Sequence, residues 1–223
     1  MIKASPKPQD EIFEAVREYR SILNLGCGGC VSVCLAGGQK EVQALNREIN
    51  HRFKLENLSS RMDNYTVERQ CNARYFEGLD DRVAGYDCLL SMACGAGVQL
   101  LAERFPELPV FPGVNTVSIG IDREIGVYEE KCRACGECVL GYTGGVCPVT
   151  RCAKSLFNGP CGGTYQGKCE VNRETPCAWV DIYNRLKAQD RLHHIYKVRP
   201  PMLWQNQIQR TTVQPAYAHR YKK

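Results

Sequence analysis

The sequence contains no run of about 18 apolar residues, which is the length that a helix needs to cross a bilayer. We therefore predict no membrane span. The N-terminal segment MIKASPKPQDEIFEAV also lacks the apolar core of a secretory signal. We accordingly expect a cytoplasmic protein, and this location sets the interpretation of its cysteines.

Histidine is scarce, with four residues in 223, and none forms an H-x₃-H or H-E-x-x-H pattern. No serine, histidine and aspartate arrangement with a nucleophile elbow is present either, so nothing favours a hydrolase. The formal net charge is +5, but thiolate-bound metal centres would add negative charge. Basic and aromatic residues share no regular element, so a nucleic-acid binder is the least favoured class.

Cysteine, in contrast, is abundant, with 14 residues. Disulfides are rare in the cytoplasm, where clustered cysteines usually indicate metal binding or redox chemistry. The first group is LGCGGCVSVC, which contains Cys27, Cys30 and Cys34. Three thiolates need a fourth ligand, for which we favour Cys94, with Cys71 as the alternative. A triplet with one remote cysteine favours an iron–sulfur cluster over zinc, because zinc knuckles more often use two C-x₂-C pairs.

The second group is larger and begins KCRACGECVLGYTGGVCPVTRC, which resembles the cysteine spacing of bacterial ferredoxins. Eight cysteines match two sites of four thiolates each. In two-cluster ferredoxins the cysteine before proline binds the other cluster, so the pairing remains open here. Two [4Fe-4S] clusters, or one cluster with one Zn²⁺, fit equally well, which gives two or three clusters in the whole chain. The eight candidate ligands are Cys132, Cys135, Cys138, Cys147, Cys152, Cys161, Cys169 and Cys177.

The first half of the chain alternates between strand and helix patterns, which predicts an α/β fold with a small parallel sheet. Cys27, Cys71 and Cys94 each follow a predicted strand, so we expect them at the carboxyl edge of that sheet. Cys88 lies inside a strand and should be a buried small hydrophobic residue. The expected helices are 9–20, 39–53 and 98–105, and the expected strands are 21–26, 65–67, 86–92 and 108–114.

The sequence predicts three segments: an α/β domain at 1–126, a cysteine-rich metal-binding domain at 127–194 and an extended arm at 195–223. The middle segment is rich in glycine and turns, so we expect metal ligation to supply its folding energy in a ferredoxin-like domain. A helix is predicted near 178–189. The arm combines prolines, aromatics and cations, and we expect it to pack on a partner subunit. The glycine loop 94–98 is better explained by the placement of Cys94 than by a phosphate site.

Four motifs together resemble a known family: LGCGGCVSVCLAGG, MACGAGVQLLAERF, CPVTRC and NGPCGG. They are similar to the iron–sulfur partner subunit of bacterial, acetogen-type methylenetetrahydrofolate reductase, also described as the reductase C-terminal domain family. The resemblance covers roughly residues 20–190. It implies metal ligation by Cys27, Cys30, Cys34, Cys94 and the eight cysteines from Cys132 to Cys177.

The resemblance also implies partners. The companion chain of that family pairs with a flavin-containing TIM-barrel subunit, which reduces methylenetetrahydrofolate in one-carbon metabolism. Its electrons come from or go to a ferredoxin, an NADH-oxidising module or a heterodisulfide-reductase-like complex. We therefore expect a non-catalytic electron-transfer subunit of an oxidoreductase. The alternatives are a zinc-binding structural or assembly subunit of the same complex, and an enzyme with an open iron site near Cys71.

Overall fold

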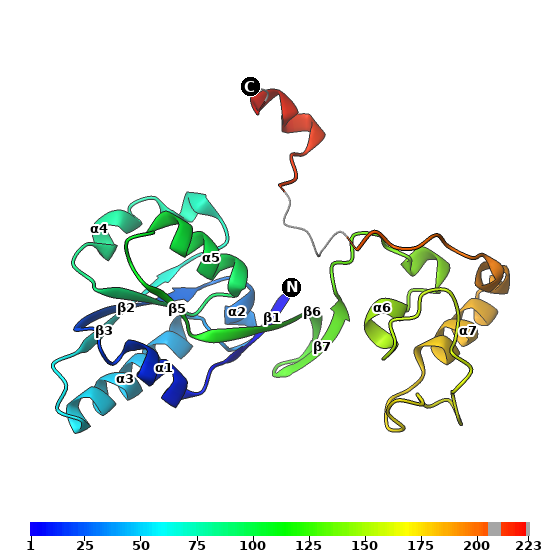
Figure 1. The fold of residues 1–223 in the computed structure, drawn as a ribbon, viewed down its shortest axis with the longest axis horizontal. Helices are drawn as coiled ribbons and strands as arrows, with labels where there is room; N and C mark the ends of the chain where they lie inside the picture. Colours follow the sequence, from blue (N-terminus) through cyan, green and yellow to red (C-terminus); the bar gives the residue numbers. More distant parts are fainter. Residues whose placement is uncertain (205–210, 222–223) are drawn as a thin grey trace. The chain divides into compact units, whose positions relative to one another are not determined.

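The computed structural model describes residues 1–204 and 211–221, and the chain divides into two compact units, Met1–Glu130 and Lys131–Lys223 (Figure 1). The N-terminal unit has an α/β architecture with one parallel and one antiparallel sheet. The parallel sheet confirms the fold predicted from the alternating pattern.

The parallel sheet has four strands in the order β3-β2-β4-β5. Its central strand β2 is buried along almost its whole length, because helices cover both faces of the sheet. Pairing is parallel throughout, so the carboxyl ends of the strands share one edge. The strands are β2 (Ser21–Cys27), β3 (Arg61–Val67), β4 (Cys88–Ser91) and β5 (Val110–Pro112).

Helices lie on both sides of this sheet (Figure 1). On one face, Phe13 and Phe53 pack with Ile22 of β2 in the larger apolar core. On the other face, Leu25 of β2 packs with Leu101 in a second core. The helices are α1 (Gln9–Val16), α2 (Cys30–Val33), α3 (Gln39–Leu55), α4 (Leu79–Val83), α5 (Gly95–Arg104) and the 3₁₀ turn η1 (Ala73–Phe76). Predicted helix 9–20 thus ends four residues early, at Val16.

The antiparallel sheet was not predicted. It contains β1 (Ile2–Pro6), β6 (Val114–Glu124) and β7 (Val127–Cys132) in the order β1-β6-β7. Lys3 is only 4% exposed in β1, where it pairs with Asp122 and its Nζ lies 4.1 Å from the ring centroid of Tyr128. A buried lysine near the start of a strand interrupts the apolar alternation by which strands are recognised in a sequence.

The C-terminal unit is held by short elements and turns. Beyond Cys132, the described residues show β pairing only as isolated bridges at Tyr165–Lys168 and Lys168–Pro176. The predicted helix 178–189 is confirmed as α7 (Ala178–Ala188), which buries Trp179, Ile182 and Leu186 on one stripe. The other elements are α6 (Pro148–Arg151) and the 3₁₀ turns η2 (Leu140–Tyr142), η3 (Leu192–Tyr196) and η5 (Pro215–Arg220).

The predicted arm 195–223 begins by packing on its own unit. Met202 is 7% exposed and joins an apolar cluster with Val139 and Val149. The backbone N–H of Leu203 donates to Glu137 at 3.4 Å. The arm also includes residues 205–210 and 222–223, which lie outside the described residues. Its packing on a partner subunit stays a prediction.

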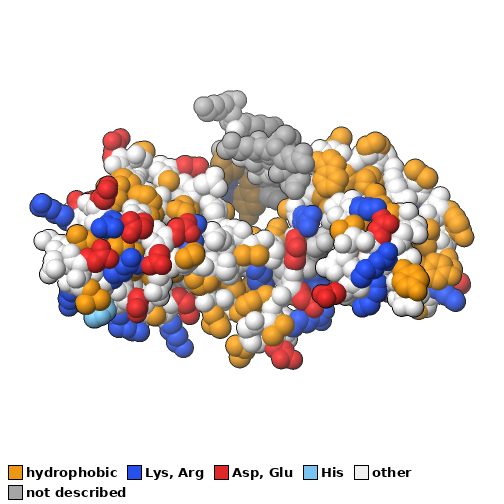
Figure 2. All heavy atoms as spheres, turned by 60° about the horizontal axis from the view of Figure 1, so that its bottom comes forward, with side chains coloured by type: hydrophobic (Ala, Val, Ile, Leu, Met, Phe, Trp, Pro, Cys, Tyr) orange, Lys and Arg blue, Asp and Glu red, His pale blue; other side chains and the backbone are white. Residues whose placement is uncertain are grey.

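The surface of the N-terminal unit carries mixed charge. Figure 2 shows Lys and Arg side chains interspersed with Asp and Glu side chains over its visible face. Arg52 of α3, for example, donates at 3.1 Å to Glu56, the C-cap residue of that helix. Among the described residues, no helix is long and apolar enough to span a membrane.

Candidate metal centres

Four cysteines line one cavity of about 510 Å³ in the N-terminal unit: Cys27, Cys30, Cys71 and Cys94. Cys27 is the last residue of β2, Cys71 follows β3, and Cys94 follows β4. Cys30 begins α2, directly after the glycine loop that leaves β2. The cavity therefore lies at the carboxyl edge of the parallel sheet, where α/β proteins usually bind ligands.

The loops around the cavity are closely packed. The Gly28 N–H donates to the Val67 carbonyl at 2.9 Å, and the Cys27 N–H donates to the Gly37 carbonyl at 2.9 Å. A Cβ at Gly37 would lie 1.9 Å from the Met92 carbonyl oxygen, so only glycine fits there. These contacts fix the chain on either side of Cys27.

Gln70 and Ser91 connect three strand ends beneath the cavity. Both are fully buried. The Ser91 hydroxyl donates to Gln70 Oε1 at 2.7 Å, and Gln70 Nε2 donates to the Leu25 and Gly26 carbonyls at 2.7 and 2.9 Å. One amide thus joins the end of β2, the loop after β3 and the end of β4. Sequence reasoning missed Gln70, because a single glutamine in a loop belongs to no motif.

The electrostatics of Cys27 combine burial with amide contacts. Burial raises the pKa of the Cys27 thiol, while the backbone N–H groups of Gln70 and Gly29 oppose the rise. The nearby Cys71 and Cys94 thiols add to the rise, because neighbouring thiolates would repel one another. The thiol is therefore neutral in the free protein, and ligation to a metal would remove its proton.

Cys34, the third cysteine of the predicted triplet, is not among the residues that line this cavity. Its side chain is buried, and its Sγ accepts a hydrogen bond from the Ala4 N–H at 3.4 Å. The same sulfur lies 3.2 Å from the Cys30 carbonyl oxygen, to which the thiol donates. Cys34 thus joins α2 to β1, whereas Cys30, Cys27 and Cys94 line the cavity.

In the C-terminal unit, two apolar clusters each contact two of the predicted ligands. Cys152 and Cys177 pack against Val146, Trp179, Ile182 and Leu186. Cys135 and Cys147 pack with Val139, Val149 and Met202. Cys132, Cys138 and Cys161 are exposed.

Cys147 and Cys169 have well-defined local settings. Cys147 is the N-cap of α6, and Pro148 occupies the first position of that helix, which proline favours. Backbone N–H groups of Val171 and Asn172, and also that of Ala153, lower the pKa of the Cys169 thiol. A salt bridge between Lys154 and Glu170 brings the segment of Cys169 near the segment of Cys152.

The donor set fits soft metals in both units. Thiolates are the preferred ligands of iron–sulfur clusters and zinc. Within the described part of the chain, no three His, Cys, Asp or Glu side chains are arranged to hold a single metal ion. In the N-terminal unit four thiols line one cavity, and a [4Fe-4S] cluster would take one thiolate at each iron.

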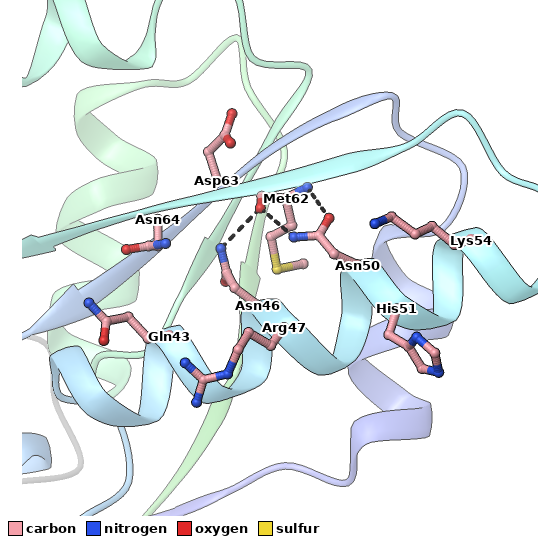
Figure 3. A pocket seen from close by; sticks show the side chains of 9 residues that line it. All are labelled: Gln43, Asn46, Arg47, Asn50, His51, Lys54, Met62, Asp63 and Asn64. Atoms are coloured by element: carbon pink, nitrogen blue, oxygen red, sulfur yellow. Dashed lines mark hydrogen bonds between the residues drawn. The ribbon is translucent and has the colours of Figure 1, made fainter.

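A second pocket, between α3 and β3, is polar and has a structural explanation. Figure 3 shows Asn46 and Asn50 pointing from α3 toward the backbone of Met62. Their Nδ2 groups donate to the Met62 carbonyl at 3.1 and 2.8 Å, and the Met62 N–H donates to Asn50 Oδ1 at 2.8 Å. These bonds fasten the helix to the edge strand of the sheet.

Residues 111–205 match the family model described as methylene-tetrahydrofolate reductase C terminal. The match covers less than half of the chain and relates this segment to methylenetetrahydrofolate reductase. No curated protein and no solved structure matches the chain.

Proposed function

We propose that this chain is an iron–sulfur electron-transfer subunit of a methylenetetrahydrofolate reductase complex. The observation that carries the proposal is that all eight cysteines from Cys132 to Cys177 lie inside the matched segment 111–205. When bound, [4Fe-4S] clusters supply one-electron transfer. In this role the chain passes electrons to or from the flavin of the catalytic subunit, in one-carbon metabolism of the reductive acetyl-CoA type.

The apolar clusters favour two consecutive sets of C-terminal ligands. Cys135 and Cys147 pack in one apolar cluster, and Cys152 and Cys177 pack in the other. The salt bridge between Lys154 and Glu170 brings the segment of Cys169 near that of Cys152. The exposed cysteines join the nearest set along the chain. The first set is Cys132, Cys135, Cys138 and Cys147, and the second is Cys152, Cys161, Cys169 and Cys177.

The surrounding residues contribute packing and hydrogen bonds. Trp179 is 7% exposed beside Cys177, and its Nε1 donates to the Leu156 carbonyl at 2.8 Å. Apolar packing excludes water from the thiolates, and amide donors such as those at Cys169 stabilise their negative charge. Burial and hydrogen bonding to sulfur are the means by which proteins set cluster potentials.

The flavin and the folate belong to a partner in this proposal. The parallel sheet of this chain has four strands, whereas a TIM barrel is built from eight. We assign the flavin to a TIM-barrel catalytic subunit of the same complex. The other electron partner is a ferredoxin, an NADH-oxidising module or a heterodisulfide-reductase-like module.

The deciding experiment measures iron, zinc and acid-labile sulfide per chain in anaerobically purified protein, with a visible spectrum before and after dithionite. We expect about eight or more irons per chain, with matching sulfide and an absorption band that dithionite bleaches. Zinc without sulfide or colour would contradict the electron-transfer role. That result would instead favour a structural or assembly subunit of the same complex.

A further inference from the structure

The four cysteines that line the N-terminal cavity differ from the set that sequence spacing predicts. Counting along the chain favours Cys27, Cys30 and Cys34 as a triplet. In the folded unit, Cys71 lines the cavity with Cys27 and Cys30, and Cys34 packs toward β1. The cavity therefore contains four cysteines without Cys34.

The position of Cys34 has a local cause. The helix α2 spans only four residues, from Cys30 to Val33, and Cys34 is its C-cap. A residue four positions after Cys30 would share its helix face in a longer helix. Here the Cys34 thiol meets the Ala4 N–H of β1, and Tyr128 of β7 donates to the Val33 carbonyl at 3.1 Å. The antiparallel sheet therefore holds the end of α2 and its cysteine.

The position of Cys71 is set by its neighbour in the chain, Gln70. Gln70 is fully buried and bonded to the backbone of β2 and to Ser91. The Gln70 backbone N–H also interacts with the Cys27 thiol and opposes the rise in its pKa. A Cβ at Gly97 of α5 would lie 2.9 Å from the Gln70 Cβ, so the helix that follows Cys94 packs closely on the same residue. Gln70 thus brings Cys71, Cys27 and Cys94 to one cavity.

The number of thiols that line the cavity, and the room that it offers, suit a [4Fe-4S] cluster. Zinc–sulfur bonds are about 2.3 Å long, so four zinc ligands converge on one point. The four thiols line a cavity of about 510 Å³, which offers more room than a single ion needs. A [4Fe-4S] core takes one thiolate at each of four irons and fills the space between them.

We infer that Cys27, Cys30, Cys71 and Cys94 are the ligands of one [4Fe-4S] cluster, and that Cys34 is a structural residue. Each thiol gives up its proton on ligation. This inference rests on the proposed iron–sulfur function and names the ligand set of its N-terminal centre.

Single alanine variants of the full chain test the ligand set. C71A should lose about four irons and four sulfides per chain relative to the wild type, as should C94A. Cys71 is exposed, so its replacement should leave the metal-free fold intact. C34A is the matched control from the same predicted motif and should keep the wild-type iron content. Loss of iron in C34A with retention in C71A would overturn the inference.

Thiol alkylation of the wild type gives a second measurement that needs no variant. Cys71 should resist iodoacetamide in the iron-loaded protein and react after the iron is chelated, as mapped by mass spectrometry. Cys34 should react in neither state, because it is buried. Rapid alkylation of Cys71 in the loaded protein would contradict the inference even if every variant misfolded.

The two proposals fail in different ways. Absence of iron from the wild-type chain would contradict the proposed electron-transfer function itself. A wild-type chain that holds iron and keeps all of it in C71A would remove only this ligand set, since the C-terminal clusters would remain.

Discussion

The Ser91 hydroxyl donates a 2.7 Å hydrogen bond to Gln70 Oε1 in the interior of the N-terminal unit. Ser91 is the last residue of β4, and Gln70 precedes Cys71 in the loop after β3. Through Nε2, Gln70 also binds two carbonyls at the end of β2. These bonds hold together the strand ends that carry the cavity cysteines, so we treat Gln70 as a positioning residue.

Replacement of Gln70 by alanine should therefore destabilise the unit and loosen the cavity. The change removes the amide partner of the Gly26 carbonyl and of the Ser91 hydroxyl, whereas the Leu25 carbonyl keeps its bond from the Met92 N–H. Each buried unsatisfied group costs about 1–3 kcal/mol, so we expect a loss of roughly 3 kcal/mol. Urea unfolding of the metal-free protein measures this loss, and iron retention during chelator challenge measures the effect on the cavity.

Q99A is the matched control for Q70A. Gln99 is exposed on α5, and its Nε2 donates only to the Gly95 carbonyl of its own helix, at 3.1 Å. We expect its stability to change by less than about 0.5 kcal/mol. Equal stability of Q70A and Q99A would show that the buried network contributes little.

The predicted parallel sheet was found because its strands and helices carry their apolar pattern locally. In β2 a run of buried residues follows the helix that covers it, and α3 shows Val42, Leu45 and Ile49 on one face. The antiparallel sheet depends on contacts between distant segments, such as Lys3 with Asp122. No pattern within one segment of the sequence predicts such a pair.

In the candidate site, too, some features follow from local sequence and others depend on contacts between distant segments. Sequence spacing grouped Cys27 with Cys30, which line the same cavity, and the strand positions correctly placed Cys94 and Cys71 at one edge of the sheet. The choice between Cys34 and Cys71 depends on where a four-residue helix ends and what packs against it. Those contacts come from β1, a strand that the sequence pattern did not predict.

The assignment of the C-terminal cysteines to two iron–sulfur clusters can be tested by combining variants. C135A and C147A should each lose one cluster, and the double variant should lose no more iron than either single variant. C135A combined with C177A should lose both clusters, because Cys177 packs in the other apolar cluster. Iron and sulfide analysis of each full-length protein gives the count. Additive loss for Cys135 with Cys147 would indicate crossed ligand sets of the ferredoxin type.

Cys88 was predicted to be a buried hydrophobic residue, and it is fully buried in β4. Burial, with a smaller contribution from Asp87, raises the pKa of its thiol from 9.0 to about 12. The folded state therefore keeps its proton where the unfolded state has lost it, so stability should fall as the pH rises from 9 toward 12. By pH 10 this group costs about 1.4 kcal/mol.

Comparison of wild type with C88A isolates this contribution. Urea unfolding of the metal-free proteins at pH 8 and pH 10 should show a smaller pH-dependent loss in C88A. In native protein at pH 8, Cys88 should also resist iodoacetamide after chelation, while Cys71 reacts. Equal pH dependence of the two proteins would contradict the raised pKa.

Metal removal should affect the two units unequally. The N-terminal unit has two large apolar cores, whereas the clusters of the C-terminal unit contain four and three buried residues. Such small clusters bury too little apolar surface to offset the entropy of ordering the turns around them. We expect ligation to supply the missing stability, so chelation should unfold the C-terminal unit first.

Tryptophan fluorescence can follow this step selectively. The two tryptophans of the chain, Trp179 and Trp204, both lie in the C-terminal unit. Trp179 is 7% exposed beside Cys177, so its emission should shift to longer wavelength when the metal is removed. Amide hydrogen exchange should meanwhile remain slow in β2 and β4, whose core is independent of the C-terminal ligands. Unchanged Trp emission after complete metal removal would show that the apolar clusters alone fold this unit.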